Sequence, residues 1–239
     1  MERDPSLRLR SFQEGGGKMK LRDNENLVVL GIFLGLISLL SALVLGIVSN
    51  QTARPIAQAR ARLEAAALQQ VLPAFDNDIN ARICKIKSPA GWIIELRQAK
   101  FKGKVAGYAA VVVNPQGYAG KIKMLAGLEK DGKIRAILVT EQSETPGLGA
   151  ELCKREFKKT IFNLTQPTPA GLPPNRYLDQ FNGKKVPAKG WTITKDGGNA
   201  LYATGATVTS RAIAKSASEI ALAFARNRKA INAAFRGVK

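Results

Sequence analysis

The longest apolar run in the chain covers residues 27–48, where no position carries a charge. A helix of this length reaches about 33 Å at about 1.5 Å per residue, enough to cross a bilayer core of about 30 Å. A secretory signal has a shorter apolar region followed by an A-x-A-like site, and no such site follows Val48. The pattern therefore predicts one transmembrane helix that is retained in the mature protein.

The hydrophobic pattern changes twice after the span. Pro55 stands where a second helix would begin, and the apolar residues that recur up to Val71 predict a helical linker over residues 49–80 that stops before Pro73. Strand-like composition then predicts strands near residues 105–113, 118–128 and 134–140, with Asp131-Gly132 as a hairpin turn. Strands joined in this way form an antiparallel meander.

Helical periodicity returns in the second half of the chain. We expect a Pro/Gly loop at residues 144–149, a short helix from about Ala150 to Phe162 and mostly irregular structure over residues 163–190. A closing helix is expected from about Thr209 to Ala234, because apolar residues recur near one of its faces. These residues are Ile213, Ala217, Ile220, Phe224, Ile231 and Phe235. We predict an α+β fold, in which a domain over residues 81–239 packs an antiparallel sheet against helices.

Composition excludes several kinds of site. The chain has no histidine, which removes the commonest general base near neutral pH and the commonest metal ligand. Its two cysteines, Cys84 and Cys153, form no clustered pattern. We expect two buried free thiols, with a disulfide between them as the alternative, and no metal or iron–sulfur site built by this chain alone.

Charge bears on orientation and partners. Residues 1–26 contain more Lys and Arg than the twenty residues after Val48, which favours a cytoplasmic N-terminal tail. Most of the formal net charge of +19 follows the span. Nucleic acid is the usual partner of so basic a protein, but it is not expected outside the cytoplasm. Three explanations of the positive charge remain open: contact with anionic lipid headgroups, contact with an acidic partner subunit, or a solvated basic surface.

A run of small and hydroxyl residues, Ala203 to Ser210, precedes the closing helix. Gly205 and Ala206 leave the backbone bare enough for a bulky group to approach, and Thr207 offers an alcohol oxygen that can be esterified. We expect Thr207 at or near the helix N-cap, where an attached phosphate would meet unpaired backbone N–H groups. Taken alone, the segment is also typical of a glycine turn that caps a helix.

A second segment separates these two interpretations. Thr204-Gly205-Ala206-Thr207 resembles the attachment motif of proteins that carry flavin mononucleotide (FMN) as a phosphoester on threonine, and residues 144–149 resemble the other signature of that family. The resemblance is to the RnfG flavin-binding subunits and, slightly less closely, to the NqrC subunits, and it covers residues 27–235. It departs at Leu201, where the motif usually carries an aspartate six residues before the modified threonine.

The resemblance implies specific roles for these residues. Thr207 would hold FMN covalently, and the turn that exposes it would consist of Thr204, Gly205 and Ala206. Thr209 and Ser210 are expected to hydrogen-bond the phosphate. The flavin environment is assigned to Glu144, Thr145, Leu148 and Gly149. The resemblance assigns no catalytic and no metal-binding residue.

The resemblance also implies a function. The protein would be an electron-relay subunit of an ion-translocating ferredoxin:NAD oxidoreductase (Rnf) complex in the bacterial inner membrane, with no complete reaction of its own. Its domain would be periplasmic, and its partners would be the other membrane and iron–sulfur subunits, a flavin transferase and membrane lipid. Two alternatives stay open: the corresponding subunit of the sodium-pumping NADH:quinone reductase, and an anchored flavin-binding or sensory module without a pump.

Overall fold

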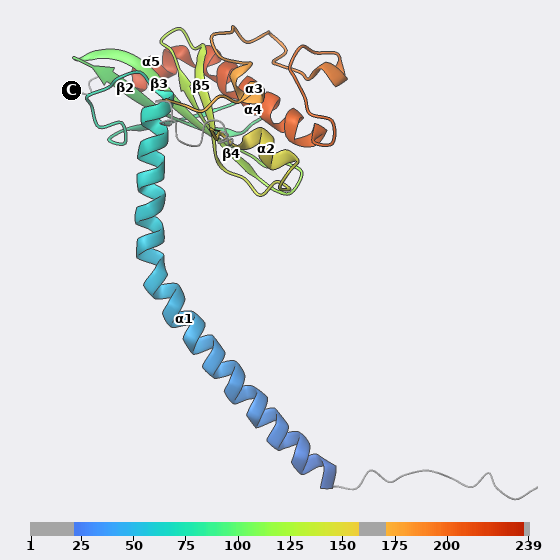
Figure 1. Cartoon of the computed structure of the whole chain (residues 1–239). Helices are drawn as coiled ribbons and strands as arrows, with labels where there is room; N and C mark the ends of the chain where they lie inside the picture. Colours follow the sequence, from blue (N-terminus) through green and yellow to red (C-terminus); the bar gives the residue numbers. More distant parts are fainter. Residues whose placement is uncertain (1–21, 158–170, 237–239) are drawn as a thin grey trace, which may run out of the picture. The chain divides into compact units, whose positions relative to one another are not determined.

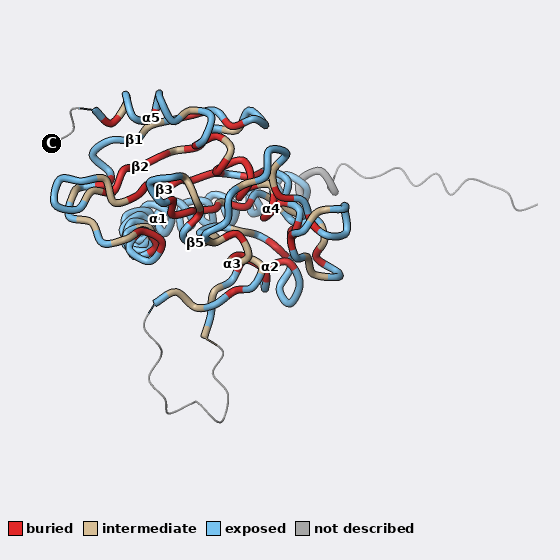
Figure 2. Tube along the Cα trace, turned by 90° about the horizontal axis from the view of Figure 1, so that it is seen from above, coloured by how far each residue is buried: buried red, intermediate tan, exposed pale blue. Residues whose placement is uncertain are grey.

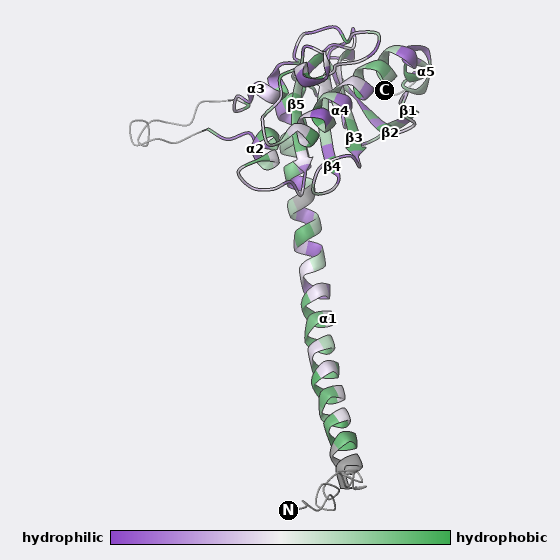
Figure 3. Ribbon diagram, turned by 90° about the vertical axis from the view of Figure 1, so that its right-hand side faces the viewer, coloured by the Kyte–Doolittle hydropathy of each residue, from purple (hydrophilic) through white to green (hydrophobic). Residues whose placement is uncertain are grey.

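A computed structural model describes residues 22–157 and 171–236, and contacts within it divide the chain into units Met1–Ala59 and Arg60–Lys239. The described part of the first unit is helical and belongs to α1, which runs from Arg22 to Val71. The apolar colouring along this helix is clear in Figure 3, and its side chains over residues 27–48 are exposed. By length and composition, α1 is able to cross a membrane.

The predicted helix start at Pro55 is wrong, because Pro55 lies inside α1. A proline within a helix removes one backbone hydrogen bond and crowds the preceding turn. Residues 51–59 are all exposed, so water can satisfy the carbonyl that loses its donor. The helix ends at Val71, before Pro73, as expected.

The second unit contains a five-stranded sheet in which every neighbouring pair is antiparallel (Figure 1). Its strands, in spatial as well as chain order, are β1 (Ile83–Lys87), β2 (Ile93–Phe101), β3 (Lys104–Asn114), β4 (Ile122–Leu128) and β5 (Ile134–Glu141). The hairpin at Asp131-Gly132 is confirmed, and Gly132 takes the left-handed conformation with φ +92°. Residues 118–121, expected in a strand, instead precede β4 as a loop.

The two faces of the sheet are covered differently. On one face lie α4 (Thr207–Arg226) and α5 (Arg228–Ala234), which contribute Ile220, Phe224 and Ile231 to the main core. A second, smaller core forms between the end of α1 and the strands, and the backbone of Val71 lies against Gly127. In Figure 2 the buried positions follow β2, β3 and α4. The predicted α+β class is confirmed.

Two predicted helical segments are corrected, whereas the region expected to be mostly irregular is so where it is described. The closing helix is two helices, because the Asn227 side chain donates hydrogen bonds to the Ala223 and Lys87 carbonyls where α4 ends. The helix expected from Ala150 to Phe162 is only α2 (Gly149–Cys153), and residues 158–162 lie outside the described range. The region expected to be irregular contains α3 (Arg176–Asp179), while residues 163–170 are not described. A short η1 (Thr194–Asp196) precedes α4.

Side-chain hydrogen bonds explain why α2 stops so early. Asn175 caps α3 and also donates to the carbonyls of Leu152 and Lys154, which would otherwise be unpaired at the end of α2. The side chain of Arg155, 3% exposed, turns inward to the Ile137 carbonyl in β5 and to Asp179. These bonds join α2, α3 and β5 into one support.

Candidate functional site

The predicted attachment segment forms a turn followed immediately by α4. Thr204 and Gly205 are exposed in the turn, and Gly205 has φ +88°, a conformation that favours glycine. Buried Ala206 is the N-cap and its side chain makes no capping bond; Thr207, half-buried, is the first helical residue. Since the first amides of a helix have no intrahelical acceptor, those of Thr207 and the next residues are available to a phosphate.

The second motif lies at the end of β5 and leads into α2. Glu144 is 4% exposed, whereas Thr145 and Leu148 are exposed. The Thr145 carbonyl accepts hydrogen bonds from the amides of Leu148 and Ala150, so the loop closes on itself as the helix begins. The segment therefore buries its acid and presents its other side chains at the surface.

The fold brings the two motifs into direct contact. The Thr209 hydroxyl donates a 2.6 Å hydrogen bond to Glu144 Oε2, and both residues are buried. A Cβ on Gly149 would lie 2.5 Å from Thr209 Oγ1 and 2.6 Å from Glu144 Oε2, so only glycine permits this approach. Leu148 lies over the other loop, with its Cδ2 3.5 Å from the position that a Cβ on Gly205 would occupy. Two segments about sixty residues apart thus form one site.

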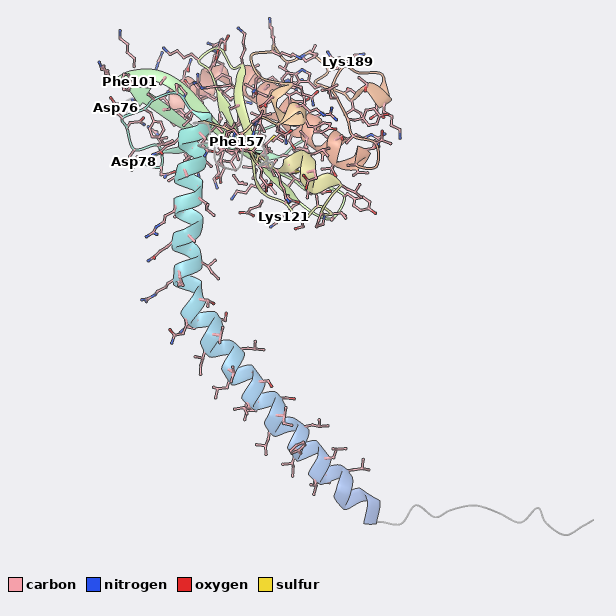
Figure 4. All side chains as sticks on the ribbon, viewed as in Figure 1. Asp76, Asp78, Phe101, Lys121, Phe157 and Lys189 are labelled. Carbon is pink, nitrogen blue, oxygen red and sulfur yellow. The ribbon has the colours of Figure 1, made fainter. Side chains whose placement is uncertain are left out.

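A third loop, which the sequence pattern suggested was part of a strand, completes this cluster. Gly117 packs so closely on Glu144 that an added Cβ would lie 2.6 Å from Oε1, and the Ala119 amide donates to the same oxygen at 3.4 Å. Between them Tyr118 is 71% exposed. The two glycines of Gly117-Tyr118-Ala119-Gly120 are the signal for a loop here. Lys121, which follows, lies at the α2 end of the domain, whereas Phe101 lies at the opposite end (Figure 4).

The hydroxyls of Thr209 and Ser210 do not have the surroundings expected of phosphate ligands. Thr209 is bonded to Glu144, and Ser210 Oγ donates to the Ala206 carbonyl and accepts from the Ala203 amide at 3.2 Å. Buried hydroxyls require such partners. The two side chains therefore secure the loops from inside, which leaves main-chain amides as the helix-end groups able to face a phosphate.

Glu144 is a buried carboxylate with no Lys or Arg within ion-pair distance among the described residues. Burial, together with the nearby charge of Glu144, raises the pKa of the Cys153 thiol to about 12. Cys153 therefore remains protonated near neutral pH and is a poor nucleophile or metal ligand. Cys84 and Cys153 are both free, so the alternative of a disulfide is not realised; Cys153 is buried as expected, but the expectation is wrong for Cys84, which is only half-buried.

Two surface hollows lie elsewhere on the second unit, and neither is lined by residues of the three loops. One, of about 280 Å³, follows the flank of α4 from Arg211 to Leu222 and includes Trp191. The other, of about 480 Å³, lies between the end of β5 and the segment from Cys153 to Glu156. Thr207 lines neither of them.

Comparison with known proteins agrees with this geometry. Residues 117–221 match the model of the FMN-binding domain family, a range that contains all three loops. The G subunit of the ion-translocating oxidoreductase complex from Haemophilus influenzae (strain ATCC 51907 / DSM 11121 / KW20 / Rd) is 31% identical over 201 residues, which cover 82% of this chain and 89% of that protein.

Two further relatives carry similar descriptions. The corresponding subunit from Cereibacter sphaeroides (strain ATCC 17029 / ATH 2.4.9) is 34% identical over 192 residues, or 78% of each chain. The G subunit of the Na⁺-translocating ferredoxin:NAD⁺ oxidoreductase complex from Acetobacterium woodii is 32% identical over 198 residues, covering 77% of this chain and 84% of that protein. The chain thus belongs to the family of G subunits of ion-translocating oxidoreductase complexes and contains an FMN-binding domain.

Proposed function

We propose that this protein is a single-pass membrane subunit that relays electrons through FMN attached to Thr207, in an ion-translocating ferredoxin:NAD oxidoreductase complex. The observation that carries the proposal is the Glu144–Thr209 hydrogen bond, which unites both motif loops beside the exposed turn at Thr204-Gly205. The relatives support membership of such a complex, because they are named as its G subunits.

The residues present fit a phosphate-linked flavin. Gly205 has no side chain to block the approach, the Ala206 methyl leaves the first helical amides without a side-chain cap, and Thr207 supplies the ester oxygen. Thr204 completes the exposed turn. The rims of the neighbouring loops, with Thr145, Leu148 and Tyr118 exposed, offer apolar and aromatic surface to the ring. Glu144 and Gly149 hold those rims together from beneath.

Attachment requires an activated flavin. A phosphoester does not form from an alcohol and a free phosphate in water without an activated donor, so the flavin transferase would use a flavin dinucleotide. The Thr207 oxygen forms a bond to the phosphorus of the FMN half, the pyrophosphate bond breaks, AMP leaves, and the hydroxyl proton passes to the solvent or the leaving phosphate. Once attached, FMN supplies one- or two-electron chemistry, and the ester prevents its loss.

The location and partners follow from the same proposal. We place the N-terminus in the cytoplasm and residues 81–239 in the periplasm, with α1 in the inner membrane among lipid. The other membrane subunits and the iron–sulfur subunits of the complex would be the electron partners. The descriptions of the relatives favour this role over the quinone reductase and over a stand-alone module.

In-gel flavin fluorescence of the denatured full-length protein, expressed with a flavin transferase, tests the attachment. We expect fluorescence in the wild type and none in Thr207→Val, which keeps the side-chain shape but has no ester oxygen. Thr194→Val is the matched control, since it removes an exposed threonine hydroxyl outside the motif loops, and it should stay fluorescent. Equal fluorescence in the wild type and in Thr207→Val would refute Thr207 as the attachment residue.

A further inference from the structure

The main chain of Leu201, in the segment that leads to the attachment turn, is held in both directions by one side chain. Its amide donates a 2.6 Å hydrogen bond to Gln180 Oε1, and its carbonyl accepts from Gln180 Nε2 at 3.4 Å. The Leu201 side chain itself is 48% exposed. The fold therefore fixes the backbone at this position and leaves the side chain outside.

Gln180 is itself held in place. It follows α3 directly as its C-cap, and its Nε2 also donates to the Tyr177 carbonyl at 2.8 Å. α3 is tied to α2 by Asn175 and to β5 by the bonds that Arg155 makes to Ile137 and Asp179. Gln180 thus connects the attachment segment to the support that α2, α3 and β5 form.

The other anchors of this segment lie to either side of Leu201. Ala200 is bonded through its amide and carbonyl to Thr192 and Thr194, and the Ala203 amide is bonded to Ser210 Oγ. The bidentate Arg211–Asp196 ion pair, with distances of 2.6 and 2.7 Å, fastens η1 to α4 outside the segment. Between Ala200 and Ala203, the structure provides Gln180 as the side-chain clamp.

From this geometry we propose that Gln180 is a positioning residue for flavin attachment: it holds the main chain at Leu201, so that the turn before Thr207 stays in the conformation on which the transferase acts. This inference rests on the proposed function. A catalyst that acts on one conformation of a loop works at a rate proportional to the fraction of molecules that adopt this conformation. Gln180 itself touches neither Thr207 nor the reacting phosphate.

The test compares Gln180→Leu, Gln180→Glu and wild type as full-length proteins in detergent, with purified transferase below saturation and a flavin dinucleotide. We expect Gln180→Leu to lower the initial rate of covalent labelling about two- to tenfold, which is the range that the net free energy of a typical hydrogen bond gives. The rate of hydrogen exchange at the Leu201 amide should increase by a similar factor. Gln180→Glu keeps the acceptor for the Leu201 amide but replaces the donor to the Tyr177 and Leu201 carbonyls by an oxygen that repels them, so its rate should also fall below that of the wild type. Saturating transferase should reduce the differences.

Gln116→Leu is the matched control, because it removes another side-chain amide that is hydrogen-bonded, to Lys215, away from the segment. It should label at the wild-type rate. Wild-type labelling rates in Gln180→Leu and Gln180→Glu would overturn the proposal. Tryptophan fluorescence verifies that each variant is folded. If the wild type itself remains unlabelled, both the proposed function and the role of Gln180 are refuted. Equal labelling rates in the wild type and in both Gln180 variants refute only the role of Gln180.

Discussion

Replacing Thr209 by valine would break the contact between the two motif loops while keeping the shape of the side chain. Thr209 is 1% exposed and its hydroxyl donates 2.6 Å to Glu144 Oε2. In Thr209→Val the Glu144 carboxylate stays buried and loses this bond. The hydrogen bond that it accepts from the Ala119 amide is long, at 3.4 Å, and does not replace it. A buried polar group left without a partner costs about 1–3 kcal/mol, more when it is charged. We therefore expect a loss of at least about 1 kcal/mol.

The assay is urea unfolding of the full-length protein in detergent, followed by the fluorescence of Trp92 and Trp191, both of which belong to the second unit. With a slope of about 1–3 kcal/mol per molar urea, a loss of about 1 kcal/mol lowers the midpoint by about 0.3–1 M. Each kcal/mol also lowers the melting temperature of a domain of this size by about 2–4 °C. Thr204→Val, at an exposed position, should remain within about 0.5 kcal/mol of wild type.

A double-mutant cycle with Glu144→Leu isolates the bond. Each single variant leaves a buried partner unsatisfied, but the double variant removes both, so its loss should be smaller than the sum by about 0.5–3 kcal/mol. Additive losses, or a Thr209→Val protein as stable as Thr204→Val, would refute the idea that this bond joins the loops.

Two further predictions concern ionisation. Burial acts to raise the pKa of Asp179, but hydrogen bonds from Arg155 and the Asn175 amide outweigh it and lower that pKa. Its stabilising contribution is therefore complete above the unfolded value of about 3.9 and is lost as the pH falls below it toward the folded pKa. Asp179→Asn should flatten the acid unfolding curve below about pH 4, and an unchanged slope would contradict this. Because the pKa of Cys153 is raised to about 12, an alkylating reagent at pH 8 should modify it only after unfolding. Rapid native labelling of its peptide by mass spectrometry would show otherwise.

Much of the fold follows from local patterns. The uncharged run over residues 27–48 and the turn at Asp131-Gly132 each depend on neighbouring residues, and each occurs where expected. The strands expected near residues 105–113 and 134–140 are also present, whereas the one expected from residue 118 begins only at Ile122, and β1 and β2 were not predicted individually. Thr207 was also found from its neighbours, since small residues before a helix are a local feature. The family resemblance then connected Thr207 to residues 144–149. The sequence motifs did not show how close these two segments lie in space.

The two helices that were predicted too long end at contacts with segments distant along the chain. α2 ends at Cys153 because Asn175, about twenty residues later, takes its terminal carbonyls. α4 ends at Arg226 where Asn227 turns to Lys87 in β1. Periodicity alone predicted a longer helix in both cases, because it does not contain the position of Asn175 or of Lys87 in space.

The sequence alone thus predicted the uncharged helix, three of the strands with their antiparallel arrangement, and the threonine that we propose for attachment. Only the tertiary structure decided that Glu144 lies beneath the loops, that Thr209 points inward to it, that the loop of Tyr118 joins them and that Gln180 holds Leu201. The physical reason is that a buried carboxylate or amide takes its hydrogen-bond partners from whichever segments the packed sheet and helices bring beside it, however far apart they are in the chain.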